Sequence, residues 1–312
     1  MAAARPFRFG VQASGAASRG EWVALARSAE SLGYSCLTMP DHFTDQLAPV
    51  PALMAAADAT TTLRVGALVF DNDYKHPVVL AKELATMDVL SDGRVEIGLG
   101  AGWMRSDYDA AGMAYDPPGV RVDRFVEGLA IVRGLMADGP FSFAGTHYRI
   151  TDYDGRPKPL QRPCPPILIG GGGKRVLGIA AREADIVGIN PSLHHGAITP
   201  ETILGMSAAS VDDKVAIVRA AAGGRMAAIE LNIRTFLVNI KPDAAAALAG
   251  TAGMLGVDPA LVAESPFALI GPPEKLVDDL LARRERWGLS YVIVGGENVE
   301  EFAPVVARLA GT

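Results

Sequence analysis

Residues 64–103 read RVGALVFDNDYKHPVVLAKELATMDVLSDGRVEIGLGAGW and contain a complete strand–helix–strand unit. The apolar run over 63–70 predicts a strand that is buried on both faces, as the strands of parallel sheets are. Pro77 suits the first turn of a helix, and apolar residues then recur at helical spacing. A second strand is predicted over 95–99. Strands that are joined through a helix pair in parallel, so this stretch predicts an α/β fold.

The same unit recurs on both sides of this stretch. Strands are predicted over residues 7–12, 35–39, 63–70, 95–99, 166–169, 185–189, 229–240 and 291–294. Eight such units close a (β/α)₈ TIM-type barrel, whereas a doubly wound open sheet would usually have fewer strands for this length. We therefore predict a single barrel domain over 1–312. It carries insertions near 138–165, which includes a β-hairpin, and near 190–228.

The composition excludes several classes of protein. The chain has 312 residues, 49% of them apolar, and a formal net charge of −6, which excludes a disordered chain and gives no indication of a nucleic-acid partner. No apolar run approaches the roughly 18 residues of a membrane span. Cys36 and Cys164 form no disulfide framework. The N-terminal residues lack the apolar segment of a signal peptide, so we expect a cytoplasmic enzyme with a small-molecule substrate.

The active site of such a barrel lies at the C-terminal ends of its strands. Asp41 and His42 follow the second predicted strand and can offer a hydrogen-bond acceptor and a titratable group to a ligand. A satisfied loop histidine beside a surface aspartate is an equally good interpretation. Asp71 and Asn72 follow the third strand and are typical of a turn, and His76 before Pro77 indicates the start of a helix.

Two glycine-rich segments follow other strands. Gly98, Gly100 and Gly102 leave room for a flat ring against the backbone, or else relieve a crowded barrel corner. They do not form the dinucleotide fingerprint, because Trp103 stands where its last glycine would be. The second segment, Gly170 to Gly173, precedes a helix, so its amides favour a phosphate site over a flexible turn.

The second glycine segment is followed by Lys174 and Arg175, which strengthen the attraction for an anion. It is not a Walker A loop, because Leu168 and Arg175 occupy positions that need Gly and Ser or Thr. No metal site is predicted, since the five histidines lack convincing ligand spacing. His194 and His195 adjoin one another in a loop and are interpreted as polar surface.

The order of these motifs resembles the luciferase-like monooxygenase superfamily. The resemblance rests on residues 64–103, on ILIGGGG ending at Gly173, and on AREADIVGI, and it extends from Phe9 to the last helix. Within the superfamily, the chain is most similar to the branch that uses the deazaflavin coenzyme F420. The resemblance implies a TIM-type barrel that binds FMN or a deazaflavin at its C-terminal mouth, often as a homodimer.

The resemblance also implies roles for individual residues. It places His42 beside the reactive face of the cofactor ring and Asp41 next to it. A bulge, often with a cis peptide bond, lies behind the ring at Ala67, Leu68 and Val69. Cofactor contacts fall at Gly100, Ala101 and Gly102, and the phosphate loop falls at Gly170, Gly171, Gly172 and Gly173. In the sugar-phosphate dehydrogenase branch a catalytic glutamate stands where this chain has Trp103.

We therefore expect an oxidoreductase that transfers a hydride between F420 and an organic substrate. His42 would exchange or share a proton and Asp41 would orient it. Phe43, Trp103 and Tyr108 would line the substrate pocket, or serve as core aromatics. The alternatives are an FMN-dependent monooxygenase that uses oxygen and, more distantly, a non-catalytic flavin-binding protein; a hydrolase would need more carboxylates at strand ends. The substrate and the direction of hydride transfer stay open.

Overall fold

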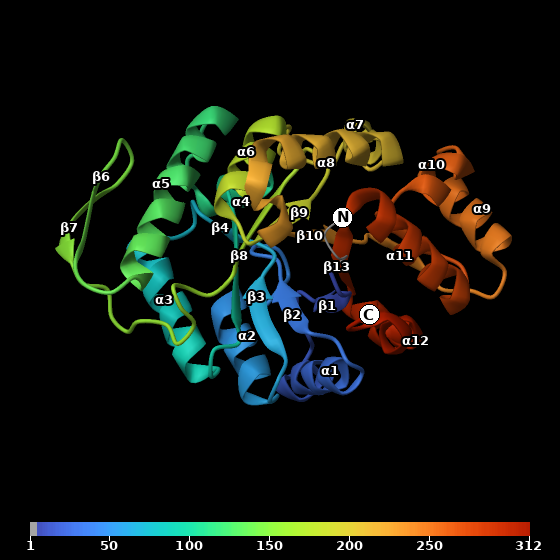
Figure 1. The fold of residues 1–312 in the computed structure, drawn as a ribbon, viewed down its shortest axis with the longest axis horizontal. Coiled ribbons are helices and arrows are strands. Elements are labelled where there is room, and N and C mark those ends of the chain that lie inside the picture. The colour runs from blue at the N-terminus through green and yellow to red at the C-terminus, as the bar shows by residue number, and fades with distance from the viewer. Residues whose placement is uncertain (1–4) are drawn as a thin grey trace.

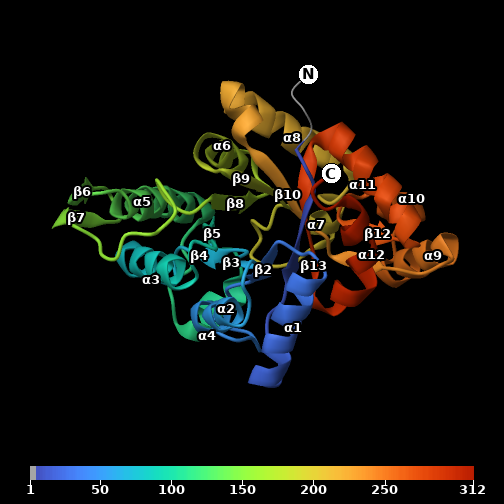
Figure 2. The same cartoon turned by 60° about the horizontal axis from the view of Figure 1, so that its bottom comes forward.

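The computed structural model describes residues 5–312 and contains a closed barrel of parallel strands (Figures 1 and 2). The strands run in the order β3-β2-β1-β13-β10-β9-β8-β5, and β3 pairs with β5 to close the ring. Eight strand positions form the barrel within the described residues, as predicted. They are β1 (Arg8–Gln12), β2 (Cys36–Met39), β3 (Arg64–Ala67) continued by β4 (Phe70–Asp71), β5 (Val95–Gly100), β8 (Ile167–Gly171), β9 (Ile186–Ile189), β10 (Glu230–Arg234) and β13 (Leu289–Gly295).

A helix follows each strand position and covers the outside of the barrel (Figure 2). Proline stands in the first turn of several of these helices, where its missing amide costs nothing. His76 caps one of them, as its Nδ1 accepts from the Val78 amide at 3.3 Å. The helices are α1 (Arg19–Ser31), α2 (Pro49–Asp58), α3 (Pro77–Leu90), α5 (Pro118–Met136), α6 (Lys174–Glu183), α8 (Ala208–Ala222), α11 (Pro273–Trp287) and α12 (Val299–Leu309).

The N-terminal end of the barrel interior is filled by charged side chains. Arg8 Nη1 lies 2.5 Å from Glu96 Oε1, and Arg8 Nη2 lies 2.6 Å from Glu230 Oε2. Arg64 Nε reaches the same Glu96 oxygen at 2.8 Å. These side chains come from β1, β3, β5 and β10. The charged cluster therefore ties together four strands at the floor of the barrel, opposite the mouth.

A β-hairpin lies between α5 and β8, where the sequence predicts one. Strands β6 (Phe141–Ala144) and β7 (Arg149–Tyr153) pair antiparallel and lie beside α5 (Figure 1). The Glu127 carboxylate of α5 accepts hydrogen bonds from three backbone amides of the turn, 146–148. The Tyr148 hydroxyl accepts a weak bond from Asn72 Nδ2 at 3.4 Å. The hairpin thus leaves the floor of the barrel and its turn reaches back to the mouth.

Further insertions surround the mouth of the barrel. The predicted insertion 190–228 comprises a loop with α7 (Pro200–Leu204), then the barrel helix α8 and the short helix η1 (Gly223–Ala228). The predicted strand 229–240 divides, because β10 ends at Arg234 and the next strand belongs to a separate small sheet. The additional elements are α4 (Arg105–Ala111), β11 (Leu237–Asn239), α9 (Ala244–Leu255), α10 (Pro259–Glu264), β12 (Ala268–Ile270) and η2 (Gly296–Asn298).

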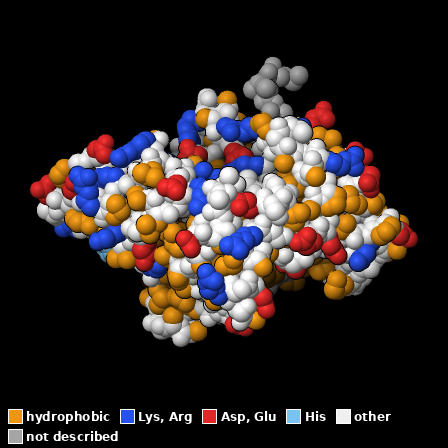
Figure 3. Space-filling model, turned by 90° about the horizontal axis from the view of Figure 1, so that it is seen from below, with side chains coloured by type: hydrophobic (Ala, Val, Ile, Leu, Met, Phe, Trp, Pro, Cys, Tyr) orange, Lys and Arg blue, Asp and Glu red, His pale blue; other side chains and the backbone are white. Residues whose placement is uncertain are grey.

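The molecular surface mixes charges of both signs. On the face shown in Figure 3, Lys and Arg alternate with Asp and Glu, and apolar side chains gather between them. Within residues 5–312, none of the helices is both long enough and apolar enough to span a membrane.

Candidate active site at the barrel mouth

His42 and Asp107 form a hydrogen-bonded pair at the mouth. His42 follows β2 and Asp107 lies in α4, and His42 Nδ1 is 2.7 Å from Asp107 Oδ2. The aspartate side chain is 3% exposed and the histidine side chain 19%. A carboxylate only accepts hydrogen bonds, so Nδ1 carries the hydrogen and Nε2 of the neutral ring keeps its lone pair. The pair therefore provides an oriented imidazole that can accept a proton.

Aromatic side chains surround this pair. Trp103 meets the His42 ring edge-on, with 5.6 Å between the centroids, and Phe43 stacks on Tyr74 at 4.4 Å. The Tyr74 hydroxyl donates to Asp107 Oδ2 at 3.0 Å. Burial and the nearby carboxylates raise the pKa of Tyr74 well above its usual range, so the hydroxyl stays a donor. Trp103 thus lies beside the His42–Asp107 pair, and Phe43 contacts it through Tyr74; their role in lining a substrate pocket stays a prediction.

Asp41 has a different partner from the one predicted. Its Oδ2 accepts from the backbone amide of Asp71 at 3.1 Å, and burial raises the pKa of its carboxyl. The carboxylate that contacts His42 is that of Asp107, whereas the prediction assigned the orienting role to Asp41. No sequence pattern indicates Asp107, because it lies 65 residues from His42 in a helix of only seven residues.

Tyr108 belongs to a buried polar network. Its exposed fraction is 0%, and its hydroxyl lies 3.2 Å from Asp71 Oδ2 and 3.0 Å from Asp73 Oδ2. Arg124 binds both oxygens of Asp73, at 2.7 and 2.8 Å. Burial raises the pKa of Asp71 to about 7. Tyr108 therefore supports the loop after β4, and its burial favours the alternative interpretation as a core aromatic.

The glycines of β5 are explained by packing. A Cβ atom at Gly98 would lie 1.9 Å from the Ala67 oxygen, and one at Gly100 would lie 2.5 Å from Val69 Cγ2. Gly102 has φ +73°, and its Cβ would meet the Tyr108 hydroxyl at 1.9 Å. The crowded-corner interpretation accounts for these three glycines without a bound ring. Ala101 between them is half-buried.

The Leu68–Val69 peptide bond, at the bulge between β3 and β4, is cis. This is the geometry that the resemblance implies. The Leu68 oxygen accepts from Gln12 Nε2 at 3.1 Å, and Gln12 Oε1 accepts from Arg234 Nε at 2.8 Å. These contacts link the C-terminal ends of β1, β3 and β10.

Gln12 and Arg234 are two mouth residues that the sequence did not single out. Burial lowers the pKa of Arg234 to about 10, and among the described residues it forms no ion pair. The positively charged guanidinium of Arg234 thus lies at the mouth. Only the position of Arg234 at the end of β10 could have indicated its place at the mouth. The sequence predicts that this strand continues to residue 240.

The N-terminus of α6 offers a site for an anion. The chain passes from β8 into α6 through Gly171, Gly172 and Gly173, and the helix has no side-chain cap within the described residues. A Cβ at Gly172 would clash with Pro191 at 2.3 Å, whereas Gly173 faces open space. The amides of the first turn and the helix dipole fit a phosphate group here.

The two basic residues that follow these glycines differ in whether their side chains are free to contact an anion at this site. Lys174 is exposed. Arg175 forms an ion pair with Asp123 of α5 and donates to the Gly119 oxygen at 3.2 Å, so it is directed away from the loop. The backbone, rather than Arg175, therefore provides the anion site.

Comparison with known proteins gives a family-level match. The family described as luciferase-like monooxygenase matches residues 3–290. An FMNH(2)-dependent dimethylsulfone monooxygenase of Pseudomonas putida is 30% identical over 220 residues, 69% of this chain and 56% of that protein. An F420-dependent glucose-6-phosphate dehydrogenase of Amycolatopsis mediterranei is 29% identical over 52% of this chain and 51% of its own length. The matched region spans about half the length of these curated relatives.

Solved structures share the fold over nearly the whole chain. Monooxygenase RslO1 from Streptomyces bottropensis has a TM-score of 0.74 at 24% identity and covers 97% of each chain. The coenzyme F420-dependent tetrahydromethanopterin reductase from Methanopyrus kandleri has a TM-score of 0.78 at 18% identity, over 98% of this chain and 99% of that one. At these identities, the likeness establishes the barrel fold alone.

Proposed function

This chain belongs to the luciferase-like monooxygenase family, and on that premise we propose that it transfers a hydride between coenzyme F420 and an organic substrate. The family contains both F420-dependent and FMN-dependent oxidoreductases. The observation that supports hydride transfer with a coupled proton is the His42–Asp107 pair, with 2.7 Å between Nδ1 and Oδ2. Removing a hydride from an organic substrate leaves a proton to be taken up, and this pair places a base at the mouth.

The residues at the mouth fit such a cofactor. The first turn of α6, beside Gly173, would hold the phosphate of the coenzyme, and the ring would lie near His42 and Trp103. When bound, the deazaflavin supplies the two-electron acceptor or donor. The protein provides binding, orientation and proton transfer.

The proton step follows from the hydrogen bonds of His42. Asp107 accepts the Nδ1 hydrogen, so Nε2 can take a proton from the substrate and hold it as an imidazolium beside the carboxylate. Tyr74 also donates to Asp107 and keeps the carboxylate in place. In the opposite direction of reaction, the same imidazolium returns the proton.

A titration with both cofactors tests the proposal. The purified protein is titrated with oxidised F420 and with FMN, and binding is followed through the absorbance or fluorescence of each ring. We expect saturable binding of F420 at micromolar concentrations and at least tenfold weaker binding of FMN. Micromolar binding of FMN without binding of F420 would contradict the F420 assignment. Binding of neither would contradict both enzymatic functions.

An FMN-dependent monooxygenase is the second candidate. It is supported by the 30% identity to the Pseudomonas putida enzyme, which extends over more of this chain than the match to the dehydrogenase. Oxygen uptake with reduced FMN and a set of small organic sulfur compounds distinguishes it. Uptake that depends on the compound and on His42 would favour the monooxygenase.

A homodimer is a further proposal that rests on the family resemblance alone. Light scattering coupled to gel filtration measures the mass directly. A single species at twice 32.7 kDa is the expected result, and a species at 32.7 kDa would contradict it.

A further inference from the structure

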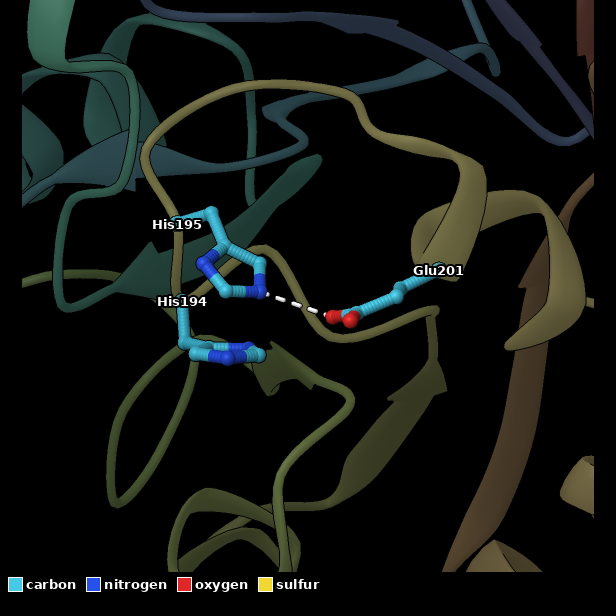
Figure 4. Close-up of side chains that lie close together, drawn as sticks. All are labelled: His194, His195 and Glu201. Carbon is cyan, nitrogen blue, oxygen red and sulfur yellow. Dashed lines mark hydrogen bonds and ion pairs between the residues drawn. The ribbon is translucent and has the colours of Figure 1, made fainter.

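The loop after β9 brings three potential metal ligands together. His194, His195 and Glu201 each offer one ligand atom, and these atoms lie within 4.8 Å of one another (Figure 4). His195 Nε2 is 2.8 Å from Glu201 Oε2, and the two imidazole rings lie 3.8 Å apart between their centroids. The sequence places the two histidines side by side but gives no reason to add the glutamate, which lies six residues further along.

Local structure explains why the glutamate lies there. Gly196 adopts φ +75°, and its amide donates to the Leu193 oxygen at 3.0 Å, which turns the chain back after the histidines. Thr199 then caps α7, with reciprocal hydrogen bonds to Thr202. This cap fixes Glu201 in the first turn of the helix, facing His195.

The loop is anchored to the rest of the mouth. The amide of Arg105, the first residue of α4, donates to the Gly196 oxygen at 3.2 Å. Gly196 is buried, and a Cβ there would lie 2.7 Å from the Tyr115 hydroxyl. The backbone under the ligands is therefore held, while the side chains of His194, His195 and Glu201 are exposed to solvent.

We propose that His194, His195 and Glu201 bind a divalent cation of the zinc class. Imidazole nitrogen and carboxylate oxygen are the ligands that Zn²⁺ prefers alongside thiolate, and three of them leave positions for water. The Ser192 hydroxyl lies 3.1 Å from His194 Nδ1, so this contact leaves His194 Nε2 for the metal. Tetrahedral bonds of about 2.0–2.1 Å place ligand atoms roughly 3.4 Å apart. Exposed side chains reach this spacing through small rotations.

The bound cation cross-links the loop to α7 at the rim of the mouth. It would join residues 194–195 to the first turn of α7 and so restrain the intervening segment, which carries Ile198 with 70% of its surface exposed. The loop also contacts α4, which carries Asp107. The site shares no residue with the His42–Asp107 pair, and its test does not depend on activity.

Calorimetric titration with ZnCl₂ tests the site on the full-length, untagged protein. We expect one zinc ion per chain with a dissociation constant of about 10 μM or less at neutral pH. His195→Ala and Glu201→Gln should each weaken binding at least tenfold. His147→Ala is the matched control, since it removes a histidine outside this loop, in the turn of the β6–β7 hairpin, and it should leave binding unchanged.

Limited proteolysis with chymotrypsin provides a second measurement, because Leu193 and Leu204 flank the ligands. Zinc should slow cleavage in this loop at least threefold in the wild-type protein and leave cleavage of Glu201→Gln unchanged. Absence of saturable binding up to about 100 μM zinc would overturn the proposal. Wild-type affinity for zinc in both His195→Ala and Glu201→Gln would overturn it as well. Equal cleavage of the wild-type loop with and without zinc would overturn the cross-link.

Discussion

At the scale of single residues, the chemistry of the mouth depends on which carboxylate touches His42. Asp41 is its neighbour in the chain, yet Asp107 accepts its hydrogen bond. Side chains of adjacent residues after a strand diverge, so a sequence pair does not guarantee a contact. The sequence predicted the histidine, because strand ends are recognisable. It could not predict a partner 65 residues away.

Asp107→Asn tests the orienting role. The amide can donate to Nδ1 and so favours the wrong tautomer of His42. We expect kcat to fall about 10- to 100-fold with KM little changed, and His42→Ala to lose about 100-fold or more. Steady-state kinetics and the pH profile of kcat measure both effects. Asp109→Asn, which neutralises an exposed carboxylate of the same helix, is the control and should stay within about threefold of wild type. Full turnover by Asp107→Asn would exclude the role.

Asp71 makes stability depend on pH. Its pKa is raised by burial from 3.8 to about 7, so the folded protein holds the proton more tightly than the unfolded chain. The stabilisation is therefore complete below about pH 4 and is lost as the pH rises through about 7. Asp71→Asn has no carboxyl to ionise and does not lose this stabilisation as the pH rises. The free energy of unfolding of the variant minus that of the wild type should therefore increase by up to about 4 kcal/mol from pH 4 to pH 8.

Urea denaturation at both pH values measures the difference for Asp71→Asn. Asp109→Asn is the control, since its carboxylate is exposed in the same region of the mouth. Its difference from wild type should be nearly the same at pH 4 and pH 8. A difference for Asp71→Asn that does not change with pH would show that the carboxyl is ionised in the folded protein.

At the scale of elements, the alternation of strands and helices was predictable, because buried parallel strands are short apolar runs between amphipathic helices. The boundaries at 229–240 were not. The run 229–240 contains no glycine or proline that would mark a break, and only the pairing partners separate β10 from β11. The sequence does not predict helix α4, because the helix is short and lacks apolar periodicity.

Gly98 in β5 and Gly173 before α6 should differ strongly in how much a substitution destabilises the protein. A Cβ at Gly98 would overlap the Ala67 carbonyl, whereas Gly173 opens into free space. Gly98→Ala should lower the free energy of unfolding by about 3 kcal/mol or more, because a backbone carbonyl cannot rotate away. Gly173→Ala should change it by less than about 1 kcal/mol. Urea midpoints compare the two, and equal midpoints would contradict the packing explanation.

At the scale of the whole molecule, the barrel has two chemically different ends. Its floor carries the charged cluster of Arg8, Arg64, Glu96 and Glu230, and its mouth carries His42 and the uncapped end of α6. The sequence predicted the mouth from the ends of strands. The sequence does not predict the charged cluster at the floor, because charged residues at strand starts are also typical of exposed turns. Closure of the barrel brings them together.

Glu96→Gln tests how much the charged cluster at the floor contributes to the free energy of unfolding. The glutamate side chain is 6% exposed and neutralises two arginines, so its loss leaves buried positive charge. We expect the free energy of unfolding to fall by about 3 kcal/mol, with kcat of the folded protein unchanged. Glu274→Gln, from the exposed pair with Arg308, is the control and should cost less than about 0.5 kcal/mol. Equal urea midpoints for the two variants would contradict this account.

The hairpin β6–β7 connects these two ends. It emerges at the floor and lies beside α5 (Figure 1). The Glu127 carboxylate in the middle of α5 accepts hydrogen bonds from the turn of the hairpin, and Tyr148 contacts Asn72 in the loop after β4. Because Asn72 directly follows Asp71, the Tyr148–Asn72 contact makes the turn of an external hairpin a neighbour of the buried polar network at the mouth.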